Sequence, residues 1–573
     1  MARPFLIILA IAAAIMLLTA LSIRSRIKRE SERIRRELKD VWGKPGTVER
    51  TDEYRKALKR YSDSQTADAT DEITWQDLDI DRLYDHLAVT RSSPGDAVFY
   101  NWFRHPSFDE EELGERDSLA SYFGSHPEER LKGQEILSGI GRTPDRTLYD
   151  DLAAPESVSP IGTGPYAALA ILTLLDLGFL FVQPVIAVFV FVGLTAFNIV
   201  LALRMKERLS PAIRGFRAAL KLMKAAEEMQ GLRRTAEEAA VAALVNRLDK
   251  MHEALGELAA FKRGSGLVTG RDRVADGLGE AVLQYVNLLI HLDLMKFDQM
   301  LKAYREHRKA CLILFGILGE LDAVCAVASD RAMLPVWCRP EFVCRDDGEA
   351  SSDVSLYVKE LVHPLLTSPV PVSVTLSRGT LVTGSNASGK STFLKETGIA
   401  SLMAQAIATV PAARYQAPLV RVMSSMALTD NLAGGESYYI VEIRSIRRIL
   451  NALEDPVPTL VIVDEVLKGT NTIERIAASA QILKAMIRPQ AVILAATHDR
   501  ELTDLLDGLY VNRHFEESIE GADIRFTYEL MEGPASTRNA IRLLEAEGYS
   551  EKIVEGARQM AEHFETAGEW SMA

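Results

Sequence analysis

Cysteine is scarce in this sequence, and positive charge is not in excess. The chain of 573 residues has four cysteines, without a C-x-x-C pair or a cluster of histidines beside them: Cys311, Cys325, Cys338 and Cys344. This argues against a disulfide scaffold and favours reduced, structural thiols in a cytosolic domain. The 66 Lys and Arg residues are outnumbered by 79 Asp and Glu residues, which gives a formal charge of -13. That balance argues against broad, nonspecific binding of nucleic acid.

Internal repeats and low-complexity tracts are also absent, but long apolar runs are present. With 47% hydrophobic residues the chain is large enough for more than one core. Phe5 to Ile23 is an uncharged run of about 19 residues, long enough to cross a bilayer as a helix. A signal peptide is the alternative, but the basic residues follow the run, between 24 and 39, and an Ala-x-Ala-like cleavage site is missing. We therefore expect a membrane anchor over residues 1–23, with contacts from its basic flank to anionic lipid on the cytoplasmic side.

A second apolar block runs from Tyr166 to Leu203, about 38 residues, which is nearly two bilayer thicknesses at the helical rise. Gln183-Pro184 divides it, so we expect a transmembrane hairpin over 166–203. Asp176 is the single charged residue inside the block. It marks either a functional group or a helix–helix or turn contact, and we favour the contact. Because a hairpin returns the chain to the side it left, residues 24–165 and 204–573 are both expected in the cytoplasm of a multi-pass cell-membrane protein.

The run Leu381-Val382-Thr383 leads into a complete G-x-x-x-x-G-K-S pattern, followed by a run compatible with a helix, Phe393 to Ala408. Such a loop surrounds phosphate with backbone N–H groups and points a helix N-terminus at the same anion. The predicted nucleotide-binding residues are Gly384, Ser385, Asn386, Ala387, Ser388, Gly389, Lys390, Ser391 and Thr392. Lys390 is expected to reach the β- and γ-phosphates, and Ser391 to hold Mg²⁺.

Two further apolar strands end in polar residues. Thr459 to Val463 runs into Asp464-Glu465, which suits a carboxylate that holds Mg²⁺ and a second one that activates water. Ala491 to Ala496 runs into Thr497-His498, and His498 falls where ABC-type ATPases keep a histidine that touches the γ-phosphate. A solvated strand end and a capped loop residue are the alternatives. The favoured interpretation is a hydrolytic site with Lys390, Glu465 and His498 as catalytic residues and Ser391 with Asp464 as metal ligands.

The segments between these strands resemble the ATPase domain of the MutS mismatch-repair family. The run Asp430-Asn431-Leu432-Ala433-Gly434-Gly435-Glu436-Ser437, continued to Glu442-Ile443, is similar to the family's D-D-L-x-x-G-x-S-T-F-M-x-E-M element. The resemblance implies that Ser437 reaches across a homodimer to the γ-phosphate of ATP on the other subunit, as a fourth catalytic residue. Further elements that resemble the family are Val362-His363-Pro364, Lys468 to Thr472, Tyr528 to Ser536 and Ala557-Arg558-Gln559. Together they cover roughly residues 355–565, ending in the family's dimerising segment.

Upstream the resemblance is weaker. Leu87 to Gly95 is similar to the start of the family's core domain, and only about 80 residues precede it, so we expect the mismatch-recognition and connector domains to be missing. Phe108-x-Glu110 is treated as a chance pattern.

Residues 204–345 are rich in helix formers and would take the place of the family's lever, with Gly264, Gly266 and Gly270 at a turn. On the later helical segment, Arg444, Arg447 and Arg448 are expected to form a solvated face.

The predicted architecture is therefore an α/β P-loop ATPase domain of ABC type at 355–565, after mainly helical regions at 24–165 and 204–345, with transmembrane helices at 1–23 and 166–203.

The predicted function is that of a MutS-like, ATP- and Mg²⁺-dependent homodimeric clamp on mismatched or branched DNA at the membrane. The alternative is a membrane-tethered switch that acts on a protein or lipid partner without DNA. An ABC transporter is disfavoured, because three spans are few for a transport path. The selectivity for the base stays open, since no aromatic residue lies between His363 and Thr380, where the family usually stacks adenine.

Overall fold

The computed structural model describes residues 22, 24–26, 28–65, 69–263, 265, 268, 289–343, 354–385, 388–426, 438–468, 470–520, 523–535, 541, 544–545 and 548–571. The chain forms two compact units that interleave along the sequence. The first, here called the helical unit, comprises Met1–Thr66, Ala88–Asn101 and Ser118–Asp330. The second, the sheet unit, comprises Ala67–Leu87, Trp102–Asp117 and Arg331–Ala573. Residues 1–21 of the predicted anchor and the glycines expected at a turn, Gly264, Gly266 and Gly270, lie outside the described residues.

The helical unit contains no strand among its described residues. Its helices, three of which (α5, α6 and α17) also include residues of the sheet unit, are α2 (Asp52–Asp63), α5 (Ser93–Arg104), α6 (Glu110–Ser125), α7 (Pro127–Ser138), α8 (Leu148–Ala153), α9 (Gly164–Phe179), α10 (Pro184–Met229), α11 (Arg233–Glu238), α12 (Ala242–Glu257), α13 (Ala259–Lys262), α16 (Leu292–Glu306) and α17 (Arg308–Met333). The described residues after 204 are helical as far as α17, as expected.

Local sequence explains where these helices begin. Thr51 caps α2 by accepting a hydrogen bond from the backbone N–H of Tyr54. Thr147 and Asp150 form a reciprocal capping box at the start of α8. Pro127 and Pro184 occupy the first turns of α7 and α10, where the missing N–H of proline costs no helical hydrogen bond.

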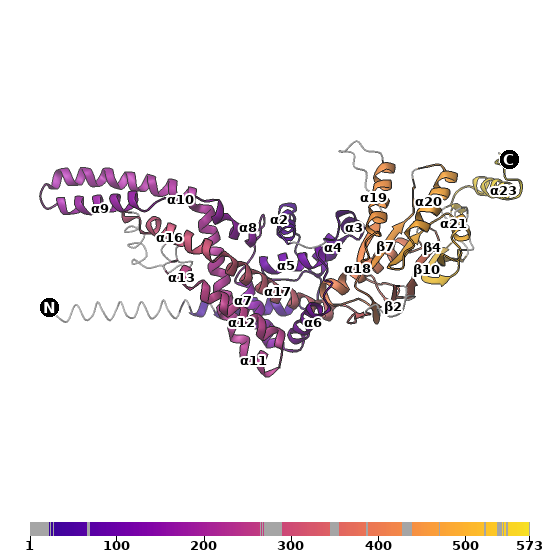
Figure 1. Ribbon diagram of the computed structural model, residues 1–573, viewed down its shortest axis with the longest axis horizontal. Coiled ribbons are helices and arrows are strands. Elements are labelled where there is room, and N and C mark those ends of the chain that lie inside the picture. The colour runs from indigo at the N-terminus through magenta and orange to yellow at the C-terminus, as the bar shows by residue number, and fades with distance from the viewer. Residues whose placement is uncertain are drawn as a thin grey trace. The chain divides into compact units, whose positions relative to one another are not determined.

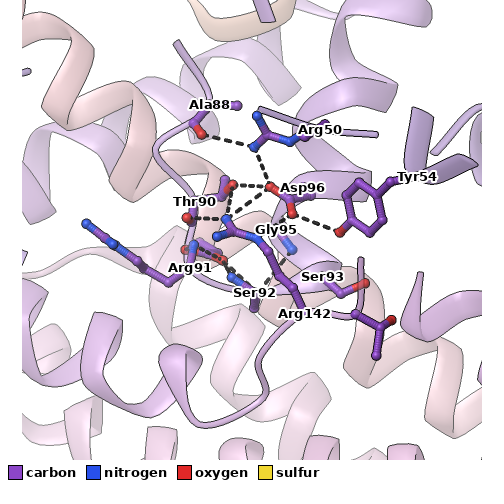
Figure 2. A network of polar contacts seen from close by, with 12 residues as sticks. Arg50, Tyr54, Ala88, Thr90, Arg91, Ser92, Ser93, Gly95, Asp96 and Arg142 are labelled. Atoms are coloured by element: carbon purple, nitrogen blue, oxygen red, sulfur yellow. Dashed lines mark hydrogen bonds and ion pairs between the residues drawn. The ribbon is translucent and has the colours of Figure 1, made fainter. Parts of the chain in front are cut away.

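A buried carboxylate, Asp96, ties the N-terminal segment of the helical unit to α5 (Figure 2). Its two oxygens accept hydrogen bonds from Arg50 (2.8 Å), Tyr54 (2.8 Å), Thr90 (2.5 Å) and Arg142 (2.5 Å to Nε). Burial alone raises the pKa of a carboxyl group, but the two guanidinium groups outweigh it and hold the pKa of Asp96 well below its ordinary value. A buried charge of this kind is tolerated because every partner is in place.

Gly95, the neighbour of Asp96, lies against the side chain of a second buried carboxylate, Asp322 of α17. A Cβ atom at position 95 would sit 2.1 Å from Asp322 Oδ2, so no other residue fits there without movement. Asp322 accepts hydrogen bonds from the backbone N–H of Ser92 (2.7 Å) and from its hydroxyl (2.6 Å). The start of α5 is therefore fixed to α17 through the side chain of Asp322, and a side chain at position 95 would displace it.

The apolar block at 166–203 folds as a helical hairpin, as the break at Gln183-Pro184 predicted. α9 and α10 pack side by side and are joined by a turn at residues 180–183 (Figure 1). Asp176 is buried, on the face of α9 that also carries Ala170 and Thr173. The group that Asp176 contacts stays a prediction.

The outward faces of this hairpin are strongly apolar. Leu175, Phe181, Val182, Val185 and Phe189 are 66–90% exposed. Two of the described helical segments are long and apolar enough to cross a membrane. They are Pro184–Glu238, which runs from α10 through α11, and Arg308–Met333, which is α17. The helix Gly164–Phe179 is apolar but shorter. The most apolar windows of the two long helices differ in burial, at 11% for the first and 72% for the second. The second is thus a core helix of a folded unit, whereas the first leaves most of its apolar window exposed.

The sheet unit is built on a six-stranded sheet with the order β10-β9-β4-β8-β7-β6. Its strands are β4 (Gly379–Thr383), β6 (Arg421–Ser425), β7 (Thr459–Asp464), β8 (Ala491–Ala496), β9 (Tyr510–Glu520) and β10 (Asp523–Glu532). All neighbours are parallel except β9 and β10. A smaller sheet, with the order β1-β5-β2-β3, is formed by β1 (Glu341–Phe342), β2 (Ser355–Leu361), β3 (Val372–Ser377) and β5 (Arg414–Ala417).

Helices cover both faces of the large sheet, because its central strands are apolar on both sides. The helices of this unit are α3 (Glu72–Asp77), α4 (Ile80–Leu87), α18 (Lys390–Ile407), α19 (Tyr438–Ala452), α20 (Thr472–Met486), α21 (Glu501–Leu505) and α23 (Glu551–Ala567). On β7, Val461 and Val463 belong to the core cluster with α19 and α20. Ile462, between them, points to the opposite face and lies against Gly398 of α18. The predicted α/β class of the C-terminal part is confirmed.

The predicted solvated face of α19 is wrong for Arg448. Its side chain is only 24% exposed, forms an ion pair with Asp71 at the start of α3, and donates a hydrogen bond to the backbone oxygen of Ser424. Asp77, at the other end of α3, accepts hydrogen bonds from Ser424 Oγ (2.6 Å) and Met426 N (2.9 Å). A segment from the N-terminal part of the chain covers this part of the sheet unit, and helical periodicity alone could not show that.

Candidate functional site

The phosphate-loop sequence lies between β4 and α18, as a strand, a tight loop and a helix that begins at Lys390. Gly384 and Gly389 have φ values of +142° and +107°, which side chains strongly disfavour. A Cβ atom at Gly384 would lie 2.9 Å from the backbone oxygen of Phe515. Both glycines are therefore required by the backbone path, while Asn386 and Ala387 lie outside the described residues.

The Lys390 ammonium is buried in the curve of this loop. Its Nζ donates to the backbone oxygens of Gly384 (2.6 Å) and Ser385 (2.7 Å) and lies 3.4 Å from His498 Nε2. Ser388 closes the same loop by donating from its hydroxyl to Ser385 O at 2.8 Å. A cation held at the start of a helix suits the binding of phosphate oxygens.

The two predicted metal ligands are brought together. Ser391, on the first turn of α18, donates its hydroxyl to Asp464 Oδ2 at the end of β7, at 2.7 Å. A hydroxyl and a carboxylate are the oxygen ligands that Mg²⁺ prefers when nucleotide phosphates and water complete its shell. Among the described residues, no group of three or more His, Cys, Asp or Glu side chains is placed to hold a metal, so a fully protein-made cage is absent from that part of the chain. The pair fits Mg²⁺ of the nucleotide-bound kind.

Glu465 and His498 meet because β7 and β8 are parallel neighbours whose last residues, Asp464 and Ala496, are in register. His498 Nε2 lies 2.7 Å from Glu465 Oε1, and Lys468 Nζ lies 3.5 Å from Oε2. The hydrogen bond from His498 is the largest cause that lowers the pKa of Glu465 to about 2, against the opposing effect of burial. The carboxylate is therefore ionised at neutral pH, as a general base must be.

The loop that carries His498 is fixed by a bidentate ion pair. Arg475 of α20 donates to both carboxylate oxygens of Asp499, at 2.6 and 3.0 Å. A cavity of about 130 Å³ opens beside these groups, lined by Glu465, Val466, Lys468, Arg475, Thr497, His498 and Asp499. It is large enough for a few water molecules next to the catalytic carboxylate.

One aromatic residue beside the phosphate loop was not assigned to the site from sequence. A Cβ atom on Gly389 would meet the ring of Tyr528 at 3.0 Å, so this ring lies over the loop. Tyr528 has a positive φ of 55° and lies within an irregularity of β10 between Phe526 and Leu530, which turns it out of the regular pleat. Its side chain is 42% exposed. No spacing rule in the sequence indicates this bulge.

The structure thus brings together Lys390, Ser391, Asp464, Glu465 and His498 at the carboxyl ends of β4, β7 and β8. Gly384, Ser385, Ser388 and Gly389 shape the loop beside them, and Thr392 lies exposed on the first turn of α18. The fourth predicted catalytic residue, Ser437, lies outside the described residues together with residues 427–436. Its predicted role stays a prediction.

Comparisons with known proteins identify the type of this domain. Residues 380–565 match the family model of MutS domain V. The chain is 35% identical over 191 residues to the DNA mismatch repair protein MutS 2 of Haloarcula marismortui, which is 33% of this chain and 20% of that protein. It is 32% identical over 249 residues to the DNA mismatch repair protein MutS of Thermus thermophilus, which is 43% of this chain and 29% of that protein. The chain therefore spans less than a third of the length of these relatives.

These matches show that the C-terminal part of the chain is similar to domain V of MutS proteins. MutS domain V is an ATPase domain, so residues 380–565 carry an ATP-hydrolysing P-loop domain. The geometry of Lys390, Ser391 and Glu465 agrees with that identification. The expected binding of ATP is likewise supported.

Proposed function

We propose that this chain is a membrane-anchored MutS-like ATPase that works as a homodimer, binding and hydrolysing ATP to close and open a clamp. The observation that carries the proposal is the convergence of the Lys390 ammonium, the Ser391–Asp464 pair and the Glu465–His498 pair at one edge of the parallel sheet. Ligands of open α/β sheets bind at this edge, beyond the carboxyl ends of the strands.

Each of these residues has a distinct task in the proposed reaction. Lys390 balances charge on the β- and γ-phosphates, and Ser391 and Asp464 hold Mg²⁺, which neutralises charge that develops on the phosphate oxygens. Glu465 accepts a hydrogen bond from the attacking water and orients it toward the γ-phosphate, while His498 contacts the γ-phosphate from the neighbouring strand end. The exposed ring of Tyr528 is placed to stack on the base, a role for which the sequence offers no aromatic residue between His363 and Thr380.

A homodimer is supported by exposed apolar side chains on α19 and α20. Ile440 and Ile443 on α19 are 41% and 38% exposed, and Ile473 at the start of α20 is 79% exposed. Large apolar side chains left exposed in this way are favourable sites for contact with a partner. We propose that a second copy covers them and presents Ser437 to the γ-phosphate, as the resemblance to the MutS family implies.

Attachment to a membrane is supported by the exposed apolar surface of the α9–α10 hairpin. Its outward side chains, Phe181 and Phe189 among them, would have to remain in water without lipid or a partner. Together with an anchor at residues 1–23, the hairpin would place both the helical regions and the ATPase domain in the cytoplasm, on the multi-pass topology that the basic flanks favour.

The partner of the clamp is proposed to be mismatched or branched DNA, because the relatives are named as DNA mismatch repair proteins. A second candidate is a membrane-tethered switch that acts on a protein or lipid partner. The formal charge of -13 and the exposed hairpin favour that alternative, because phosphate contacts need local positive charge.

One binding experiment separates the two candidates. The full chain in lipid nanodiscs is titrated with perfect, mismatched and branched duplexes, with and without ATP, over a series of salt concentrations. Preference for mismatched or branched duplex that depends on ATP and weakens with salt supports the DNA clamp. Equal, weak binding to all three duplexes, or none, refutes it in favour of the switch.

A further inference from the structure

The loop after β7 holds the catalytic carboxylate in a strained backbone. Glu465 and Leu467 have φ values of 58° and 61°, in the left-handed region that residues with side chains rarely adopt. Strain of this kind persists only when the surroundings hold the backbone in place. The position of Glu465 therefore depends on whatever binds this loop.

Three side- or main-chain groups bind successive residues of the loop. Glu465 N donates to the backbone oxygen of Ala496 (3.0 Å), and Ser479 Oγ of α20 donates to Val466 O (3.1 Å). The third group is the carboxylate of Glu442 on α19. Its Oε1 accepts from the backbone N–H of Leu467 at 2.6 Å, and Lys468 N lies 3.4 Å away.

Glu442 makes this contact from a buried position. Its side chain belongs to a residue that is 4% exposed, and the second oxygen, Oε2, has no hydrogen-bond partner among the described residues. Burial raises the pKa of Glu442, although the two N–H groups and Lys468 act in the opposite direction. A buried carboxyl group is costly to keep, so the loop contact must outweigh that cost.

The same helix is attached at a second point, closer to its C-terminus. Arg448 donates to Ser424 O and pairs with Asp71, so α19 is fixed to β6 and α3 about 1.7 turns beyond Glu442. Because α19 is held at both positions, we expect it to move as a rigid element. A displacement of one part of the helix would then shift the other part as well. Glu442 is the group through which such a displacement reaches the loop of Glu465.

We propose that Glu442 is a positioning residue for ATP hydrolysis. It fixes the backbone conformation of residues 465–468, and the orientation of the catalytic carboxylate therefore depends on the position of α19. The proposal rests on the proposed role of Glu465 as the base. It adds that the rate of hydrolysis responds to α19, the helix that carries the exposed Ile440 and Ile443.

Steady-state and single-turnover hydrolysis by the full chain test this role. Glu442→Ala removes the acceptor, and we expect kcat to fall about 100-fold, as for a reacting group displaced by about 1 Å, with KM and Kd for ATP within about twofold. Glu442→Gln keeps an acceptor oxygen and should restore most of kcat.

The matched control is Glu454→Gln together with Glu454→Ala. This carboxylate lies in the turn after α19, is 75% exposed and pairs with Arg488 at 3.7 Å, so both variants should keep wild-type kcat. If Glu442→Ala fails to fold, Glu442→Asp decides, because it keeps the charge but shortens the side chain and should lose kcat. Wild-type kcat in folded Glu442→Ala or Glu442→Asp, or a loss of ATP affinity that parallels the loss of kcat, overturns the proposal.

Glu465→Gln is measured beside these variants. If it hydrolyses ATP at the wild-type rate, the proposed role of Glu465 fails, and the positioning role fails with it. If Glu465→Gln is inactive while Glu442→Ala is fully active, only the positioning role of Glu442 is refuted.

Discussion

His498 Nε2 lies 2.7 Å from Glu465 Oε1, although the two residues follow different strands. The parallel register of β7 and β8 places their ends side by side, and the hydrogen bond holds the pKa of Glu465 at about 2, below its ordinary value of 4.5. His498 therefore has two tasks in the proposed site. It touches the γ-phosphate, and it keeps the base ionised and correctly directed.

Replacement of His498 should change the pH dependence of hydrolysis as well as its rate. Without the hydrogen bond, the pKa of Glu465 should rise toward 4.5. A base works when deprotonated, so a higher pKa moves the loss of activity to higher pH. We expect His498→Ala to lower kcat about 100-fold and to show an acidic limb near pH 4 to 5 that the wild type lacks. His563→Ala, at an exposed position of α23, is the control; the same acidic limb in both variants would contradict this account.

Tyr528 should contribute to nucleotide binding and not to chemistry. Its ring lies over Gly389 and is partly exposed, as stacking on a base requires. Tyr528→Ala is expected to raise KM for ATP about tenfold with kcat nearly unchanged, whereas Tyr528→Phe should retain wild-type KM because the ring is kept. Tyr549→Ala removes another exposed tyrosine as a control. A wild-type KM in Tyr528→Ala would show that the ring does not touch the base.

The composite site predicts a definite pattern in mixed dimers. With Lys390→Ala and Ser437→Ala in the same protomer, each of the two sites contains one altered residue, so turnover should be lost. With the two substitutions in opposite protomers, one site is intact and about half of the activity should remain. The opposite pattern, half activity with both changes in one protomer, would place Ser437 in the site of its own subunit.

Membrane attachment should survive loss of the N-terminal run. A chain without residues 1–23 is expected to stay in the membrane fraction through the hairpin. Aspartate at Leu175 and Phe189, two outward positions of that hairpin, should release the shortened chain, since a charge at the bilayer centre costs roughly 3 kcal/mol. The same substitutions at Ile473, outside the hairpin, should not alter the fractionation. Release of the shortened chain without any further change would exclude the second anchor.

The sequence predicts those parts of the site that depend on short local patterns of residues. The strand and glycines around Lys390, the acidic end of β7 and the polar end of β8 were predicted because apolar strands and tight loops have short-range signatures. The ion pair between Arg448 and Asp71 and the hydrogen bond from Leu467 N to Glu442 were not predicted. They join segments that are distant in the sequence, and helical periodicity says only that a position is apolar or polar.

The case of Tyr528 illustrates the same limit in a strand. Regular alternation along β10 would have placed it by its parity alone, but the irregularity between Phe526 and Leu530 turns it toward the phosphate loop. The break of the hairpin at Gln183-Pro184 was predicted correctly, because proline at the first turn of a helix is a strong local signal.

The most direct test of the central claim is ATP binding and turnover by Glu465→Gln in the full chain. Glutamine preserves the shape of the side chain but cannot accept the proton of an attacking water. The account predicts wild-type affinity for ATP, a fall in turnover of at least about 100-fold, and a dimer that remains closed on unhydrolysed ATP. Turnover at the wild-type rate would contradict it.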